Sequence, residues 1–208
     1  MAMNGSTIRK RYIVTAFVLI LSAIAYVLVA RPMLRSMGAT TYGPLSSHSK
    51  DIILVHAEKL LMNVPPLSDL SDDSLRFVAM PSFGDRWMAV SLSSDGSRAL
   101  GHLAVLDRKT GKVSKRAFRL TEPEFDRFTA AWDAETGNYW GALSLWADGT
   151  SLGFERRRGS TITSGIGNSP CHYDVLGDLA ADHIGPHAEE LTDLSVPYID
   201  RFLASDHC

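Results

Sequence analysis

Charge is absent from one long stretch near the start of this sequence. Residues 12–30 contain no Asp, Glu, Lys or Arg, and neither proline nor glycine interrupts these nineteen positions. At about 1.5 Å per residue they would form a helix of about 28 Å, close to the roughly 30 Å hydrocarbon thickness of a bilayer. The stretch also lacks an amphipathic stripe, which argues against a buried core helix. It therefore predicts an N-terminal transmembrane helix that uses the lipid bilayer as its partner.

A cleaved signal peptide is the alternative interpretation of this stretch. The apolar region of a signal peptide spans about 7–15 residues, which is shorter than the stretch found here. The small-residue pattern of a cleavage site is imperfect at residues 28–30, and the better match at residues 36–38 lies beyond Arg31 and Arg35. A retained anchor is therefore favoured over cleavage.

Basic residues on the two sides of the anchor predict its orientation. Arg9, Lys10 and Arg11 precede the anchor, whereas only Arg31 and Arg35 follow it. Because the more basic flank stays in the cytoplasm, the N-terminus is expected there. The predicted organisation is a cytoplasmic basic tail (1–11), a single-pass transmembrane helix (12–30), a tether (31–49) and an extracytoplasmic α+β domain (50–208). In a Gram-negative bacterium this domain would be periplasmic.

Cysteine is scarce, with Cys171 and Cys208 the only two in the chain. Both fall in the domain expected outside the cytoplasm, where an oxidising environment permits disulfides. The sequence therefore predicts one bridge between them, which would fix the C-terminal end of the chain.

Excess positive charge is missing from the same domain. All 23 acidic residues but only 16 of the 21 Lys and Arg residues lie in 36–208, a net charge of −7. Nucleic-acid binding requires a concentrated positive field, so a nucleic-acid partner is not expected.

Short β-rich runs separated by turns fill the middle of the domain. Apolar helical patterns occupy residues 50–62 and 121–133, and two acidic helical stretches follow at 173–183 and 186–194. The sequence predicts an α+β fold, an antiparallel sheet of about six strands with helices packed on at least one face. The expected strands are residues 75–80, 86–93, 98–106, 113–120, 138–146 and 151–157, and residues 159–170 are expected to form a loop.

Tryptophan gathers on one face of two expected strands. Period-two alternation places Trp87 on a face with small residues, and Trp140 and Trp146 on a similar face of the second strand. Exposed indoles in such a groove would suit a glycan or a peptide of an envelope protein. The competing prediction is that the helix over 121–133 covers this face. Its aromatic residues Phe125, Phe128 and Trp132 recur at three- and four-residue spacing and so share one side of the helix.

No assembled catalytic or cofactor motif is recognised. Gly185 and Pro186 separate His183 from His187, so no metal site is predicted, and the glycines of 165–167 lack the further residues of a phosphate-binding loop, so no cofactor is predicted. The favoured function is a membrane-anchored interaction domain. The alternative is a small anchored hydrolase with a site near loop 159–172, using His172 or His183 as its base.

Overall fold

The computed structural model describes residues 15–22, 24, 26, 41–48, 52–137, 149–168 and 173–195. The chain divides into two compact units, Met1–Met37 and Gly38–Cys208. In the first unit, residues 15–22 are helical, and most of the remaining predicted span lies outside the described residues. Among the residues described, none belongs to a helix with both the length and the apolar character needed to cross a bilayer.

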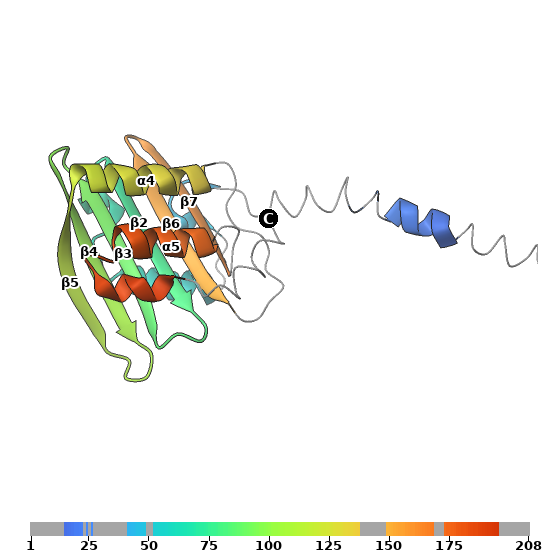
Figure 1. Cartoon of the computed structure of the whole chain (residues 1–208), viewed down its shortest axis with the longest axis horizontal. Helices are drawn as coiled ribbons and strands as arrows, with labels where there is room; N and C mark the ends of the chain where they lie inside the picture. The colour runs from blue at the N-terminus through green and yellow to red at the C-terminus, as the bar shows by residue number, and fades with distance from the viewer. Residues whose placement is uncertain are drawn as a thin grey trace, which may run out of the picture. The chain divides into compact units, whose positions relative to one another are not determined.

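The second unit is built on one antiparallel sheet, as the sequence predicted (Figure 1). Its strands follow the spatial order β1-β7-β6-β2-β3-β4-β5. Their bounds are β1 Thr41–Tyr42, β2 Asp73–Pro81, β3 Arg86–Ser94, β4 Arg98–Asp107, β5 Val113–Thr121, β6 Thr150–Arg158 and β7 Thr161–Asn168. Five predicted strands match β2 to β6, and the sixth, residues 138–146, lies outside the described residues.

Two sequence predictions are wrong or incomplete at the β7 edge. Residues 161–168, expected to be loop, form β7 and pair with β6 along its length. Small residues make this strand resemble a loop in sequence, but hydrogen bonds to the backbone of β6 satisfy its backbone groups. Thr41–Tyr42, within the predicted tether, pairs with β7, so the chain is already part of the sheet at this point.

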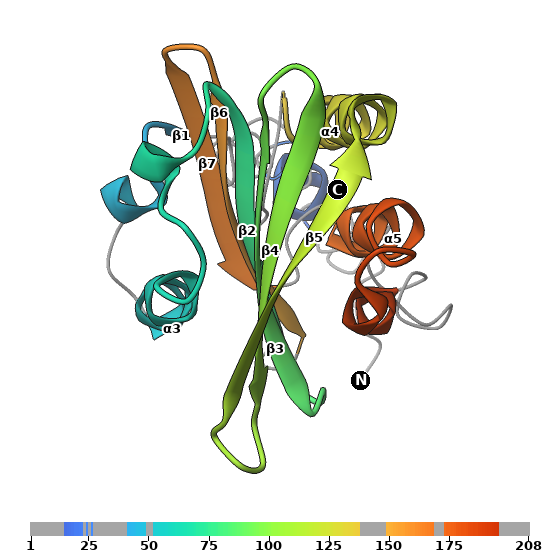
Figure 2. The same ribbon diagram turned by 90° about the vertical axis from the view of Figure 1, so that its left-hand side faces the viewer.

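Helices cover the two faces of the sheet unequally (Figure 2). The helix α3 (Ile52–Leu61) lies on one face, whereas α4 (Glu122–Thr136) and α5 (Tyr173–His183) lie on the other. Short 3-10 helices complete the unit: η2 Leu45–Ser47, η3 Leu67–Asp69 and η4 Glu189–Leu194. The last was predicted as part of a longer helix over 186–194.

The core on the α4 side is aromatic and aliphatic. Phe125, Phe128 and Trp132 of α4 are buried in one cluster with Met88 and Val90 of β3. Trp132 stacks on Phe77 of β2 with ring centroids 5.0 Å apart. The sequence correctly predicted that this stripe of α4 packs on the sheet, and burying it supplies much of the hydrophobic stabilisation of the unit.

The face that α4 covers is the opposite of the predicted one. Trp87 and Ala89 belong to the second core cluster, beneath α3. Alternation correctly predicted which residues of β3 share a face, but both faces are apolar enough to bury, so the sequence could not decide which helix covers which. The small residues Ala89 and Ala104 allow α3 to approach closely, through its fully buried Ala57.

Candidate binding surface

Trp87, the one described member of the predicted Trp groove, is half-buried beside α3. Its ring centroid lies 5.5 Å from that of His56 on α3. The guanidinium of Arg108 lies 5.0 Å from the same ring, a cation–π contact, and the indole N–H donates to the carbonyl of Pro81 at 3.2 Å. His56 and Arg108 lie against the indole ring of Trp87 and restrict its use as a flat surface on which a sugar could stack. The edge of this ring lies next to the exposed loop between β2 and β3.

That loop presents Phe83 to solvent. Phe83 is 83% exposed between β2 and β3. On either side of it, the carbonyl oxygens of Ser82 and Gly84 accept hydrogen bonds from Arg108 at 2.6 and 2.8 Å. Lys109 adds an ion pair of 2.7 Å to Asp85. The β4–β5 hairpin therefore holds the backbone of the loop, so less backbone entropy is lost when the exposed Phe83 ring binds a partner.

Large apolar side chains are exposed on one side of the unit. Two come from the outward side of α3, one directly follows the C-terminal end of α3, and two come from the α3-facing side of β4 and β5. The described residues of this unit expose six such side chains in all: Ile52, Val55, Met62, Phe83, Leu100 and Val113. Apart from Phe83, in the end loop, all of them lie on the α3 side. A set of exposed large apolar side chains confined to one side is typical of a protein-binding site.

Part of the sheet on this side is left uncovered by α3. The helix packs on β2, β3, β6 and β7. Beyond it, exposed or half-buried side chains of β4 and β5 form a surface that we name the open lane: Leu100, His102, Val113, Lys115, Ala117 and Arg119. Neither Lys115 nor Arg119 makes an ion pair with any residue that the structure describes. The open lane therefore has an exposed apolar side chain near each end, Leu100 on β4 and Val113 on β5, and two cations, Lys115 and Arg119, along its β5 edge.

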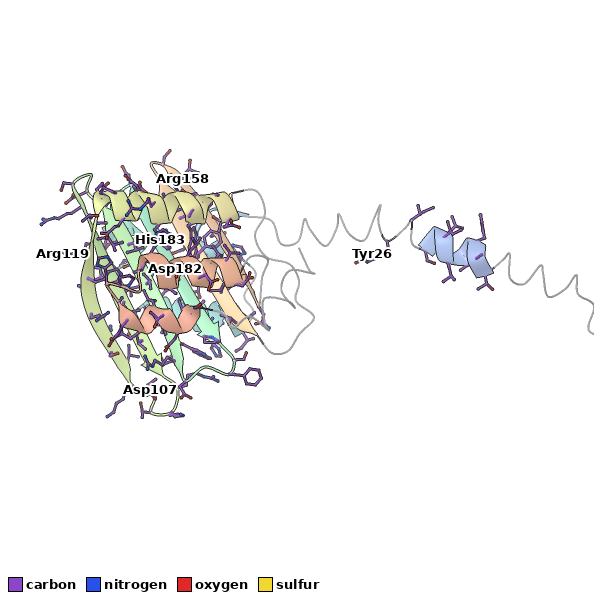
Figure 3. The ribbon with its side chains drawn as sticks, viewed as in Figure 1. Tyr26, Asp107, Arg119, Arg158, Asp182 and His183 are labelled. Carbon is purple, nitrogen blue, oxygen red and sulfur yellow. The ribbon has the colours of Figure 1, made fainter. Side chains whose placement is uncertain are left out.

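The opposite side of the unit is closed and acidic. Arg116 of β5 points to that side, where it forms an ion pair of 3.0 Å with Glu190 and donates to the carbonyl of His187. Acidic side chains recur along the outer part of α5 and η4, with Asp182, Glu189 and Asp193 exposed. Figure 3 labels Arg119 on β5 and Asp182 on α5, the two contrasting signs of charge. The sheet thus separates an apolar, basic side from an acidic one.

A row of polar side chains crosses the sheet beneath α3. Arg76 lies opposite Glu155 on β6 and opposite Ser91 on β3, and Glu155 lies opposite Ser164 on β7. Glu155 accepts from Arg76 at 2.6 Å and from the backbone N–H of Leu45 at 2.8 Å. Because this row lies within the fold, its first role is to fix the position of β1 and η2 against the sheet.

One contact of this row bears on the hydrolase alternative. Nε2 of His48 lies 3.0 Å from Oγ of Ser164, in the segment where the sequence placed a hydrolytic site. Ser164 has no exposed surface, however, and the two oxygens of the neighbouring Glu155 are taken by Arg76 and Leu45. A nucleophile must meet its substrate, so this arrangement is better suited to structural hydrogen bonding.

Two other polar residues, Arg156 and His183, take structural positions. Arg156, from the basic run at the end of β6, is buried and donates to Asp133 of α4 and to Asp73. The ring of His183 lies 6.1 Å from that of Phe128. No group of three potential ligands that could hold a metal ion occurs in the described part of the chain.

Several predicted site residues cannot be placed on this surface. Trp140, Trp146, His172, Cys171 and Cys208 lie outside the described residues. Conversely, Phe83, Leu100 and Val113 were not singled out from the sequence. The available signal was the period-two pattern of 98–106, in which Leu100 is out of phase with the buried Ala99 and Leu103.

Comparison of the chain with models of protein families, with curated proteins and with solved structures finds no match.

Proposed function

We propose that this chain is a single-pass membrane protein whose α+β domain lies outside the cytoplasm and binds another protein through its α3 side. The observation that carries the binding role is the one-sided exposure of Ile52, Val55, Met62, Leu100 and Val113. Isolated exposed apolar residues are common on protein surfaces, but a set confined to one side is typical of an interface. A partner in the cell envelope fits the location that the anchor implies.

The first unit supports the anchor. Five consecutive apolar residues, 17–21, are each 49–66% exposed in the helical segment. At 3.6 residues per turn, five consecutive positions cover the whole circumference of a helix. A helix that is apolar all round and covered on no side needs an apolar environment, which a bilayer supplies over the uncharged 12–30 stretch.

The location has a direct test. Alkaline phosphatase, which is active only outside the cytoplasm, is fused to the C-terminus of the full chain in a bacterial host. The basic residues at 9–11 predict an active fusion that stays with the membrane after carbonate extraction. An inactive fusion, with a cytoplasm-active reporter working in its place, would reverse the orientation. A fusion released into the soluble fraction would instead indicate cleavage.

The binding role is tested by photo-cross-linking in cells that naturally make the protein. Benzoylphenylalanine replaces Val55 on the α3 side, or the exposed Asp182 on α5 as the matched control. The proposal predicts protein adducts from position 55 and none, or far fewer, from position 182. Equal adducts from the two sides, or adducts to glycan alone at position 55, would overturn protein binding through the α3 side.

A further inference from the structure

We infer that the open lane binds an amphipathic helix of the partner, lying beside α3, with an apolar stripe on β4 and β5 and acidic side chains beside Lys115 and Arg119. This inference rests on the proposed function and specifies the kind of partner segment. Its starting point is the difference between the two faces of the same pair of strands. On one face α4 contacts β4 and β5, whereas on the other Leu100 of β4 and all the α3-side residues of β5 (Val113, Lys115, Ala117 and Arg119) are exposed.

The width of the open lane suits one helix. Neighbouring strands lie about 4.8 Å apart, so two strands span about 10 Å, and packed helices lie about 8–10 Å from axis to axis. Ala104 in the middle of β4 is already buried with α3, so a helix next to α3 would lie over β5 and the exposed Leu100 end of β4. The existing packing of α3 on Ala89 and Ala104 shows how this face accepts a helix. Ala117 offers a similarly small side chain on the next strand, opposite His102.

Charge indicates which side chains the partner helix carries. The strand β5 contains Lys115, Arg116 and Arg119 and no acidic residue, and α3-side positions 115 and 119 are exposed. Buried apolar contact with Leu100 and Val113 would bring these two cations close to the partner. Acidic side chains on the flank of the partner helix would neutralise them, whereas basic ones would be repelled.

An added strand at the β5 edge is the other way to use this region, and the edge residues disfavour it. Exposed Lys and Arg side chains along an edge strand hinder pairing with another strand. Strand addition would also leave Leu100, which lies on β4, outside the interface. A helix in the open lane covers Leu100 and Val113 together, which explains the exposure of both.

The experiment places benzoylphenylalanine at Ala117 of the full chain, in cells that naturally make it, and identifies the cross-linked peptide by mass spectrometry. The expected adduct is a partner segment whose sequence has apolar residues at helical spacing with Asp or Glu beside them. The double change Lys115→Glu and Arg119→Glu should reduce this adduct at least tenfold. Lys115→Arg with Arg119→Lys should preserve it, because the charge is kept.

Two controls separate failure of this inference from failure of the proposed function. Arg127→Glu reverses an exposed cation on α4, on the opposite side, and should leave the adduct unchanged. Adducts at Val55 report protein binding to the α3 side and should survive the double charge reversal in part, which also shows that the variant folds. Adducts at Val55 but none at Ala117 would overturn the helix site alone. The helix site would also be overturned if the adduct at Ala117 were an extended or basic segment, a second copy of this chain, a lipid or a glycan. The absence of adducts at both positions would overturn both proposals.

Discussion

Arg76 and Glu155 lie directly opposite each other on β2 and β6, and their side chains form an ion pair of 2.6 Å beneath α3. Their side chains are 11% and 8% exposed, so water screens the pair poorly. Arg76 also donates to the carbonyl of Leu61, the last residue of α3, at 3.0 Å. One guanidinium thus ties the sheet to the C-terminal end of the helix that forms half of the proposed interface.

We predict that Glu155→Ala destabilises the domain by about 3–5 kcal/mol, because it leaves a buried cation without its partner. Chemical denaturation of the full chain in detergent, followed by tryptophan fluorescence, measures this free energy of unfolding. The double variant Arg76→Met with Glu155→Leu removes both charges and should recover most of the loss. A double variant as unstable as the single one would contradict the account of the pair.

Phe128 and Phe83 form a second, matched comparison. Phe128, on the side of α4 that packs on the sheet, is fully buried, so Phe128→Ala should cost about 3–5 kcal/mol of unfolding free energy. Phe83→Ala removes the same atoms from an exposed position and should change the denaturation midpoint very little. In the cross-linking experiment, however, Phe83→Ala should weaken the adducts at Val55. A large stability loss from Phe83→Ala would place that ring in the core instead.

A substitution at Gly101 tests how closely the ring of Phe118 on β5 packs against β4 on the α4 side. A Cβ atom at this position would lie 2.2 Å from the ring of Phe118 on the opposite strand. Gly101→Ala should therefore cost about 1–3 kcal/mol through overpacking, measured by the same denaturation assay. Adding Phe118→Leu frees space beside Gly101 and should make the alanine less costly. If alanine costs as much with leucine at 118, steric contact is not the cause.

We predict that the stability of the domain depends on pH through Glu124, at the start of α4. The backbone N–H of Thr121 donates to its carboxylate at 2.7 Å and the hydroxyl of Thr121 at 2.8 Å, and these bonds lower the pKa of Glu124 below its ordinary value of 4.5. A lowered pKa means that the folded state favours the carboxylate. Its contribution to stability is therefore complete above pH 4.5 and disappears as pH falls through the folded-state pKa.

The variant Glu124→Gln keeps a capping side chain and removes the charge. Its denaturation midpoint should lie below that of the wild type at pH 7, and the two midpoints should converge as the pH is lowered below 4.5. Asp126→Asn, which removes another exposed charge of α4, serves as the control. A difference between wild type and Glu124→Gln that stays constant from pH 7 to pH 3 would rule out this role of the carboxylate.

The predicted bridge between Cys171 and Cys208 is checked by mass spectrometry of the unreduced protein. We expect one linked peptide pair, because both residues fall in the domain placed outside the cytoplasm. Protein purified with its thiols blocked from the start provides the control for exchange during handling. Two separately alkylated thiols would contradict the bridge.

Local signals in the sequence predicted most of the fold. The cap formed by Thr121 and Glu124 and the spacing of Phe125, Phe128 and Trp132 correctly placed α4, because they depend on residues near one another in the chain. The strand β7 was missed, since its small residues gain regular structure only through pairing with β6. The choice of face for α4 was also wrong, because it depends on how all the apolar surfaces are shared in three dimensions.

The candidate surface was harder to predict than the core. The sequence predicted Trp87 as a binding residue because exposed indoles bind ligands, yet its ring contacts His56 and Arg108. Leu100 and Val113 are ordinary strand residues, and their exposure follows from the extent of α3, which buries Ala104 of β4 but covers neither Leu100 nor the α3-facing side of β5. A residue lies on the surface when no other element covers it. The local sequence does not encode which elements cover which residues.

The central claim, that a partner covers the α3 side, is tested most directly by the accessibility of that side in intact membranes. Val55→Cys and Leu100→Cys report the α3 side, and Asp182→Cys reports the opposite side, with each modified peptide identified by mass spectrometry. The account predicts that a water-soluble maleimide modifies positions 55 and 100 at least tenfold more slowly in native membranes than in purified protein, whereas position 182 reacts equally in both. Equal rates at all three positions before and after purification would contradict it.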